Sequence, residues 1–594
     1  MDQSDSINNN MKVESSSLVS NGCFDYKGRI ADKRKTGGWK AAPFIIVNEV
    51  AERFAFFSIA VNMVAYLVGE MHQPLPEAAA HVGNWVGAAY ILTLFGAFMA
   101  DAYLGRFQTI ITFSCIYAAG MVLLTLSGSI PSLRPPQCTL RPCPPATSGQ
   151  TAFLYLSLAL IAVGTGGIKP CVSSFGADQF DEADQTEASH KYSFFNWFFF
   201  AINTGALLGI TLLVYAQVRL GWAWGLGIPA AATVASILVL AAGWRRYRYQ
   251  RPAGSAFTRF AQVIVAAVRN RGKEVGGGLY EVEESKECEI HGATKLAHTH
   301  QYRFLDKAAV VTDPALAAAG TRNRWRLCTV TQVEELKCIV RIIPVWASTI
   351  ALAISYSQIS TFFVAQAATM DRSLSPAFSI PAGSTPVFSA VNALLVVPLY
   401  ERLAVPFLRS RTGHPRGITS LQRIGAGVLV SVPAMVSAAV VERNRRSAAG
   451  GPRPSVFWLF PQCFLMGMAE VLAYVGQLEF FYDEATDGTR SISSALFLSE
   501  FGIGSWLSSA LVEIVGRATG GAAEGWLRDD LNQSRLDYFY WLLAGINVVN
   551  FAVYLWVARR YKGRRVAEPA VAVEATEELG GGIGLQNGKG EESI

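Results

Sequence analysis

Long apolar stretches recur along the whole chain and are separated by short polar segments. A helix needs about 20 mostly apolar residues to cross the hydrocarbon core of a membrane. Ten stretches approach or exceed this length without an internal charge: Ala79–Ala100, Phe107–Leu133, Ala146–Ile168, Tyr192–Val218, Gly221–Trp244, Ile342–Met370, Ser373–Tyr400, Ile424–Val441, Pro454–Ala469 (continuing past Glu470) and Tyr538–Ala558. This pattern predicts a membrane protein built from many spanning helices.

Two further stretches are equally long but carry internal charges. They are Ala41–Gly69, interrupted by Glu49, Glu52 and Arg53, and Ser491–Val515, interrupted by Glu500 and Glu513. The total is about twelve spans by the length criterion. Composition agrees, because 51% of the 594 residues are hydrophobic, only 16% are charged, and the mean hydropathy is +0.28. These values exclude disordered, collagenous and small disulfide-rich proteins, and a net charge of +6 gives no sign of a nucleic-acid surface.

The distribution of positive charge predicts the orientation of the spans. Basic residues cluster before the first span and after the last, and the positive-inside rule places both clusters in the cytoplasm. No apolar signal-peptide core occurs in the first 40 residues. One loop disagrees with this topology, because four arginines lie between spans nine and ten, on the expected outer side: Arg443, Arg445, Arg446 and Arg453.

The largest interruption between spans divides them into six and six. We therefore predict an all-α membrane protein with twelve transmembrane helices in two six-helix halves. The expected parts are a cytoplasmic N-terminal tail (1–40), a first half (41–244), a cytoplasmic central loop (245–334), a second half (335–561) and a disordered cytoplasmic tail (562–594). Cys138 and Cys143 lie in a Pro-rich outer loop, where a disulfide and two free thiols are equally compatible with the sequence.

Ionisable residues inside spans are candidates for function, because each costs about 2.5–3.5 kcal/mol on insertion scales. Glu49, Glu52 and Arg53 share the first span, Lys169 lies in the fourth and Glu470 in the tenth. At a rise of about 1.5 Å per residue, Glu52 and Lys169 reach depths of roughly 16 and 14 Å. A lysine and carboxylates at one depth form a pair that responds to protonation, as proton-coupled transport requires. The alternative is that these charges only lock helices together as ion pairs.

A short inner turn between spans two and three carries Gly96, Asp101, Gly105 and Arg106. Its glycines and its Asp/Arg pair suit a tight, gated helix contact, although a simple turn with exposed charges is the alternative. Together with the six-plus-six plan, this turn resembles the major facilitator superfamily, in which two halves rock around a midplane site. The sequence therefore favours the major facilitator fold.

Three segments resemble the signatures of the plant nitrate/peptide transporter family, the proton-dependent oligopeptide transporters. They are Glu49–Phe54 (EVAERF), Gly166–Asp181 (GGIKPCVSSFGADQFD) and Phe194–Gly205 (FFNWFFFAINTG). The Gln462, Glu470 and Gln477 stretch and Ser420–Arg423 also look like plant members. The resemblance runs from about Gly37 to Tyr561.

The resemblance implies roles for individual residues. Glu49, Glu52, Arg53 and Lys169 would couple transport to protons. In peptide-carrying relatives the positions of Arg53 and Lys169 face the substrate carboxylate, and that of Glu470 faces the amino end. The resemblance adds further substrate-binding positions, for which helix-packing polarity is the alternative: Tyr90, Asn203 and Asn392.

Two departures from the family pattern leave the substrate open. Phe56 and Phe57 stand where peptide carriers often have tyrosines, and Tyr356 holds the place of a histidine that contacts nitrate in a nitrate carrier of the family. Tyr356 donates a hydrogen bond but cannot become cationic. The resemblance thus implies a proton-coupled symporter importing nitrate or di- and tripeptides. Another organic anion or plant metabolite as cargo, or a solute sensor using the same fold, are the alternatives.

The remaining expectations follow from these conclusions. No HExxH, GxSxG or clustered His/Cys site is present, so we expect neither an enzyme nor a metal site. We expect no cofactor, with the proton gradient as the energy source. The expected partners are the solute, protons and the lipid bilayer, with no nucleic acid, and the protein is expected to be a monomer or a weak homodimer. We expect the plasma membrane rather than the vacuolar membrane.

Overall fold

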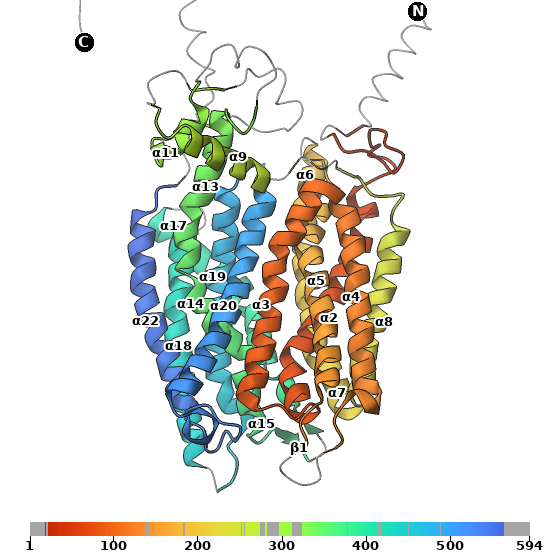
Figure 1. The fold of residues 1–594 in the computed structure, drawn as a ribbon, viewed down its shortest axis with the longest axis vertical. Coiled ribbons are helices and arrows are strands. Elements are labelled where there is room, and N and C mark those ends of the chain that lie inside the picture. The colour runs from red at the N-terminus through yellow and green to blue at the C-terminus, as the bar shows by residue number, and fades with distance from the viewer. Residues whose placement is uncertain are drawn as a thin grey trace, which may run out of the picture. The chain divides into compact units, whose positions relative to one another are not determined.

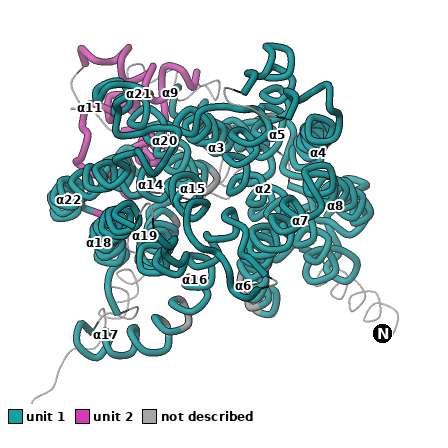
Figure 2. The backbone as a smooth tube through the Cα atoms, turned by 90° about the horizontal axis from the view of Figure 1, so that it is seen from below, with its two compact units in different colours: residues 1–261, 338–562 teal, residues 262–337, 563–594 magenta. Residues whose placement is uncertain are grey.

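The computed structural model describes residues 18–19, 22–137, 143–181, 184–250, 252, 254, 256–273, 279–281, 296–311, 323–376, 378–413, 417–448, 451–486 and 489–563. The disordered tail expected from residue 562 lies almost wholly outside these residues. Within them the chain forms two compact units (Figure 2), the first comprising Met1–Ala261 with Cys338–Lys562 and the second Gln262–Lys337 with Gly563–Ile594. Unit 1 contains the long apolar helices. Whether unit 1 divides into the two expected halves stays a prediction.

Six long helical segments form the first part of unit 1. Their bounds are α2 (Ala42–Gly69), α3 (Leu75–Met99), α4 (Arg106–Ser129), α5 (Ser148–Ala177), α6 (Gln185–Leu208) and α8 (Trp222–Ala242). A π-helical turn at Gly209–Leu213 joins α6 to α7 (Val214–Arg219), so these three pieces correspond to one expected span. Helix α4 packs on α5 and α8, and α2 packs on α6 and α8.

The second set of helices follows the central segment in the sequence. It comprises α13 (Val330–Ala347), α14 (Ile350–Tyr356), α15 (Phe362–Ala368), α16 (Val387–Leu399), α17 (Val405–Thr412), α18 (Ser420–Ser447), α19 (Phe460–Glu484), α20 (Arg490–Ala518), α21 (Gly521–Glu524) and α22 (Leu536–Arg560). Helix α18 packs on α19 and α22, and α16 packs on α19. Helix α3 packs along α20, so the two sets of helices lie side by side (Figure 1).

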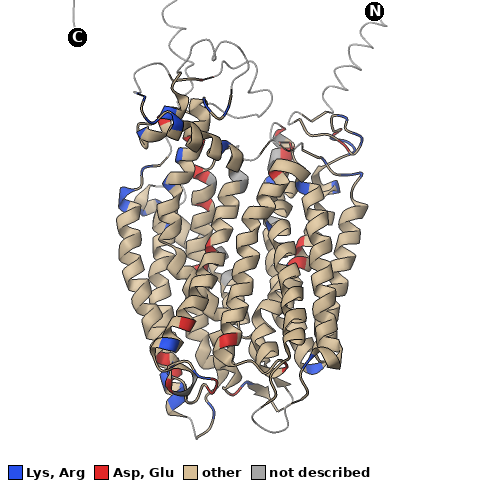
Figure 3. Cartoon of the chain, in the orientation of Figure 1, with Lys and Arg blue, Asp and Glu red and all other residues tan. Residues whose placement is uncertain are grey.

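Ten helices among the described residues are long and apolar enough to cross a membrane. The two remaining expected spans correspond to α2 and to the shorter apolar helix at Ala382–Val396. Charged residues gather towards the ends of the long helices and are sparse along their middle parts (Figure 3). The few charges at mid-height therefore need partners inside the protein.

One expected span differs from the structure. The stretch Ser373–Tyr400 begins with a small antiparallel hairpin of β1 (Ser373–Ser375) and β2 (Phe378–Ser379), and α16 starts only at Val387. Three prolines before α16, Pro376, Pro381 and Pro386, explain the difference. A proline interrupts a helix interior because it lacks a backbone N–H and its ring clashes with the preceding turn.

The N-terminal segment at 22–41 packs against the first helices and is not a loose tail. Phe24 forms backbone bridges with Ile30 and Tyr249. The N–H of Gly37 donates to the carbonyl of Arg246, and that of Gly38 donates to the carbonyl of Gln179. These contacts cannot be predicted from the sequence, because the segment is polar and has no helical or strand periodicity.

Two predictions concern loops on the expected outer side: the disulfide of Cys143 and the arginines between spans nine and ten. Cys143 is disulfide-bonded, whereas its expected partner Cys138 lies outside the described residues. Arg445 forms an ion pair with Glu442 at 2.8 Å, and Arg446 forms one with Asp537 at 2.7 Å. These two arginines are neutralised by partners on the same side, so they weigh less against the predicted topology than the sequence suggested.

The central segment belongs mainly to unit 2. Its helices are α9 (Ala256–Arg269), which begins in unit 1, and α11 (Arg303–Asp306). Within unit 2, Asn270 donates a side-chain hydrogen bond to the carbonyl of Lys307 at 3.0 Å. The side chain of Lys337 is fully buried and forms ion pairs with Asp306 and Glu334.

Candidate functional site

Four charged residues predicted to act together meet between α2 and α5. Arg53 Nε lies 2.7 Å from Glu49 Oε1 and 3.5 Å from Glu52 Oε2. Lys169 Nζ lies 3.1 Å from Glu52 Oε1. The two acids and two bases therefore form one continuous network, with Glu52 joining the cations of two helices.

Burial makes this network sensitive to its protonation state. Glu49 and Glu52 are 1% and 3% exposed, and the Lys169 side chain is fully buried. The Lys169 ammonium also lies 4.2 Å from the centre of the Phe56 ring and 5.4 Å from that of Tyr90. Because buried charges interact strongly and are costly when unpaired, adding a proton to Glu52 weakens the hold on Lys169.

Glycines allow α3 and α4 to pack closely on α5 next to Lys169. A Cβ on Gly96 of α3 would lie 2.2 Å from the Gly166 carbonyl oxygen of α5. A Cβ on Gly167 would lie 2.0 Å from the ring of Phe113 on α4. Residues 96 and 167 thus need to be glycine, because a neighbouring helix packs directly on each of them.

Glu470 lies on α19 and has a different environment. Its Oε1 accepts a hydrogen bond from the Tyr356 hydroxyl at 3.1 Å. Among the described residues, no lysine or arginine forms an ion pair with Glu470. A carboxylate in the helical core with one neutral donor is open to a cationic group supplied from outside.

The site residues divide by their exposure. Glu49, Glu52 and Lys169 are buried, whereas the other members, although deep in the helices, are half-buried: Arg53, Tyr90, Tyr356 and Glu470. Partial exposure at this depth means that these four side chains border space that water can reach. The buried acids Glu49 and Glu52 are shielded from it, which suits holding a proton rather than a solute.

Aromatic rings connect the two sets of helices beside this site. The ring of Tyr90 on α3 stacks on that of Phe501 on α20, with centroids 5.3 Å apart. Phe501 also contacts Tyr356 and Tyr474, at 5.9 and 4.4 Å between centroids. The Lys169 side and the Glu470 side are therefore bridged by Tyr90 and Phe501.

Among the described residues, neither predicted asparagine forms a hydrogen bond with the charged network. Asn203 is half-buried, and its amide donates to the carbonyl of Phe199 on its own helix at 2.8 Å. Asn392 is buried, and its amide donates to the carbonyl of Phe464 on α19. Their contacts are those of helix packing, and a role in binding stays a prediction.

The predicted gating turn forms a helix junction. Asp101 lies in a π-helical turn at Ala100–Leu104, and Gly105 follows with φ +76°, a conformation that glycine adopts at low cost. Arg106 then forms an ion pair with Asp178, the residue that ends α5. This partner lies 72 residues away, so the sequence spacing of the turn could not identify it.

The two helix sets are also joined where α2 ends and α3 begins, the outer end in the predicted topology. Trp506 and Ser509 of α20 donate side-chain hydrogen bonds to the carbonyls of Asn84 and Ala80 of α3. Further bonds at this end run from the Leu75 N–H to Asp529 Oδ1 and from the Ser384 hydroxyl to the Ile210 carbonyl. These contacts hold the two helix sets together at this end.

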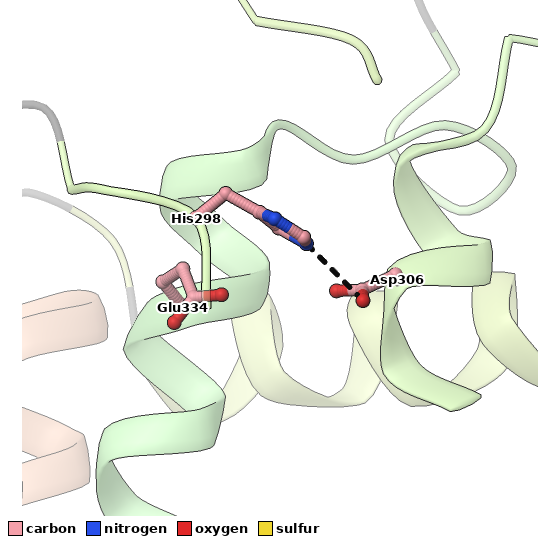
Figure 4. Close-up of side chains that lie close together, drawn as sticks. All are labelled: His298, Asp306 and Glu334. Carbon is pink, nitrogen blue, oxygen red and sulfur yellow. Dashed lines mark ion pairs between the residues drawn. The ribbon is translucent and has the colours of Figure 1, made fainter. Parts of the chain in front are cut away.

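One group of side chains has the composition of a metal site (Figure 4). His298, Asp306 and Glu334 of unit 2 offer ligand atoms within 4.8 Å of one another. Lys337 Nζ, however, lies 2.6 Å from Asp306 Oδ1 and 2.7 Å from Glu334 Oε1. Because an ammonium already sits between the carboxylates, we interpret the group as a buried ion-pair cluster, and the absence of a metal stays a prediction.

The chain is similar in sequence to a known family and to curated relatives along most of its length. The family model described as the POT family matches residues 107–527. Among curated relatives from Arabidopsis thaliana, Protein NRT1/ PTR FAMILY 8.1 is 47% identical over 92% of this chain and 97% of its own length. Protein NRT1/ PTR FAMILY 8.5 is 46% identical over 94% and 95%, and Protein NRT1/ PTR FAMILY 6.3 is 43% identical over 93% and 96%.

Solved structures show the same fold. An auto-inhibited POT family peptide transporter superimposes with a TM-score of 0.65 at 21% identity, covering 89% of this chain and 99% of that one. The POT family transporter PepTSo gives a TM-score of 0.65 at 21% identity, with coverages of 88% and 98%. These likenesses confirm the predicted fold class, an all-α membrane protein of the major facilitator type.

Proposed function

The chain belongs to the POT family of transporters, and on this basis we propose that it is a proton-coupled symporter that imports small nitrogenous solutes by alternating access. It is a multi-pass membrane transporter and not an enzyme. The observation that carries the proposal is the buried contact of Lys169 with Glu52, beside a second, half-buried carboxyl at Glu470.

Proton coupling is proposed from the network on α2 and α5. When Glu52 is ionised, it holds Lys169 at 3.1 Å. When Glu52 takes up a proton, that attraction is lost, and Lys169 and Arg53 become available to an anionic group on the solute. Two states of one network, each favoured by a different proton occupancy, are what coupling requires.

Among nitrogenous solutes, we propose di- and tripeptides. A peptide carries a carboxylate at one end and an ammonium at the other, and the half-buried groups offer a cation at Arg53 and an anion at Glu470. An ionised Glu470 has only the Tyr356 hydroxyl as a hydrogen-bonding partner among the described residues. It therefore attracts an ammonium group and repels a small anion.

Nitrate is the second candidate, and the cations favour it. Arg53 and Lys169 lie on adjacent helices and share Glu52, so protonating Glu52 would leave a strongly positive site for an anion. For nitrate, Glu470 would have to be neutral during binding, and Tyr356 would serve as a hydrogen-bond donor.

One variant separates the two candidates. We expect Glu470→Gln to abolish binding and uptake of a labelled dipeptide, because the peptide ammonium loses its counter-charge. If nitrate is the cargo, nitrate binding should persist or improve in the same variant. Glu513→Gln is the matched control, because Glu513 is 60% exposed and lies on α20 away from this site. Wild-type binding and uptake of both solutes by Glu470→Gln would show that Glu470 only packs against its neighbours.

The remaining features of the proposal are the membrane, the energy source, the oligomeric state and the residues that contact solute. We propose that the protein works in the plasma membrane, uses the proton gradient without a cofactor, and acts as a monomer or a weak homodimer. Residues that contact solute are proposed to be Arg53, Tyr90, Lys169, Asn203, Tyr356, Asn392 and Glu470.

A further inference from the structure

Another buried carboxyl in the membrane region is not used by the transport cycle described above. Glu500 lies on α20, is 0% exposed, and neither of its carboxyl oxygens has a hydrogen-bond partner in the described structure. No lysine or arginine among the described residues pairs with it. An ionised carboxyl in such a position is costly, so burial favours the form that carries a proton.

The side chains next to Glu500 are polar. Gln477 on α19 and Thr349, which precedes α14, lie close enough to interact with the carboxyl. Gln477 is 0% exposed, and neither its amide nitrogen nor its oxygen has a partner. The Thr349 hydroxyl donates to the carbonyl of Trp346 at 2.8 Å. Buried polar atoms without partners are rare, and a cluster of them marks a place for an exchangeable proton or bound water.

A tyrosine connects this cluster to the solute-facing side. Tyr474 lies on α19 between Glu470 and Gln477, and its hydroxyl is buried without a partner. Its ring packs on those of Phe497 and Phe501, which flank Glu500 on α20, at 6.1 and 4.4 Å between centroids. The rings of Tyr356 and Tyr90 also contact Phe501. The rings of Tyr474 and Tyr356 lie 5.7 Å apart, and the Tyr356 hydroxyl donates to Glu470. These groups are the titratable neighbours that face the path between the two carboxyls.

We propose that Glu500 is a second proton-carrying group of the transporter, which exchanges its proton with Glu470 through the Tyr474 hydroxyl. This inference rests on the proposed proton-coupled function and adds a site to it. In the exchange, the O–H bond of the Glu500 carboxyl breaks as its proton passes to the Tyr474 oxygen. The Tyr474 O–H proton passes to Glu470, so one carboxyl loses a proton, the other gains one, and the total charge is unchanged.

In this proposal Glu500 stores a proton while the solute occupies Glu470, a role that packing alone does not require. When a solute ammonium binds an ionised Glu470, the proton is better held on Glu500. When the solute leaves, the lone carboxyl of Glu470 is costly, and the proton returns to it. The C-terminal helices would then carry a proton in alternation with the solute, beside the proton on the Glu52 network.

The test compares Glu500→Gln with wild type and with Glu513→Gln, an exposed acid on the same helix. In proteoliposomes with a labelled dipeptide, the membrane potential that nulls net flux gives the number of protons per solute. We expect Glu500→Gln to transport with one coupled proton fewer and a less steep dependence on pH, whereas Glu513→Gln matches wild type. An unchanged stoichiometry and pH profile in Glu500→Gln would overturn the proposal.

A spectroscopic readout keeps the inference separate from the transport assay. The infrared band of a protonated carboxyl should change with pH in the wild-type protein, and the Glu500 component should be missing in Glu500→Gln. If the Gln variant does not fold, Glu500→Asp retains a carboxyl that is withdrawn from Tyr474, and we expect a shifted pH profile. An unshifted profile would contradict the proposal. If wild-type uptake does not depend on the proton gradient but the infrared band changes with pH, proton-coupled transport is contradicted. Protonation of Glu500 is then still supported.

Discussion

Lys169 Nζ lies 3.1 Å from Glu52 Oε1, although the two residues are 117 positions apart on α5 and α2. Neither side chain is more than 4% exposed. Protonation of the Glu52 carboxyl on α2 would therefore remove the counter-charge of the Lys169 ammonium on α5.

Removing the cation of this pair should uncouple transport without unfolding the protein. In Lys169→Ala, we expect gradient-driven uptake to be lost, because Glu52 no longer alternates between an ion pair and a protonated state. Glu52 can relax by taking up a proton, so the variant should remain folded. Uptake of labelled dipeptide under a pH gradient is the readout, with size-exclusion behaviour as the check on folding. Normal gradient-driven uptake would show that Lys169 is only structural.

The contact of α3 with α5 should tolerate no side chain at Gly96. In Gly96→Val, the first added carbon would lie 2.2 Å from the Gly166 carbonyl oxygen, and overpacking of this kind costs about 1–3 kcal/mol or more. We expect a melting temperature several degrees lower, measured in detergent. Gly545→Val is the matched control, because no atom lies within 4 Å of its added carbon. Equal melting temperatures for the two variants would refute the close approach.

The N-terminal segment should loosen when Lys33 is removed. Lys33 Nζ lies 3.1 Å from both Asp181 and Asp184. We expect Lys33→Ala to raise amide hydrogen exchange in residues 22–40. Lys35→Ala serves as the control, because the Lys35 side chain is 83% exposed and its one ion pair among the described residues is with Asp32, at 3.8 Å. Equal exchange in both variants would contradict the anchoring role.

The pH dependence of this contact follows from the acid. The hydrogen bonds from Lys33 and from the backbone of Thr186 and Glu187 hold the pKa of Asp184 below its ordinary value. An acid with a lowered folded-state pKa contributes stability above its unfolded pKa and loses it as the pH falls through the folded value. Protection of residues 22–40 relative to the intrinsic exchange rate at each pH should therefore be constant through neutral pH and should fall only in strong acid. A fall in protection near neutral pH would indicate another titrating group.

Much of the charged site could be predicted from helix geometry. The depth of Glu52 and Lys169 followed from the helical rise, and their contact follows from equal depth. The pairing of Glu49 with Arg53 followed from the four-residue spacing on one helix. Glu470 was recognised as a buried acid without a partner on its own helix, and its bond to Tyr356 fits that prediction.

Contacts between distant segments could not be predicted in this way. Arg106 pairs with Asp178 because α4 and α5 pack together, and no periodicity in the sequence encodes that choice. Glu500 was visible as a charge inside a span, but its isolation depends on what α19 and α14 place around it. The length and lack of charge of Ser373–Tyr400 predict a continuous helix. They do not predict the hairpin at 373–379, which forms where prolines interrupt the helix.

The central claim is that an inward proton gradient drives solute across the membrane through this chain. The most direct measurement is accumulation of labelled dipeptide by proteoliposomes with an acidic exterior, with and without a protonophore. We predict that the solute rises inside above its external concentration and that the protonophore abolishes this accumulation. Uptake that is equally fast and reaches the same level with the protonophore present would contradict the account.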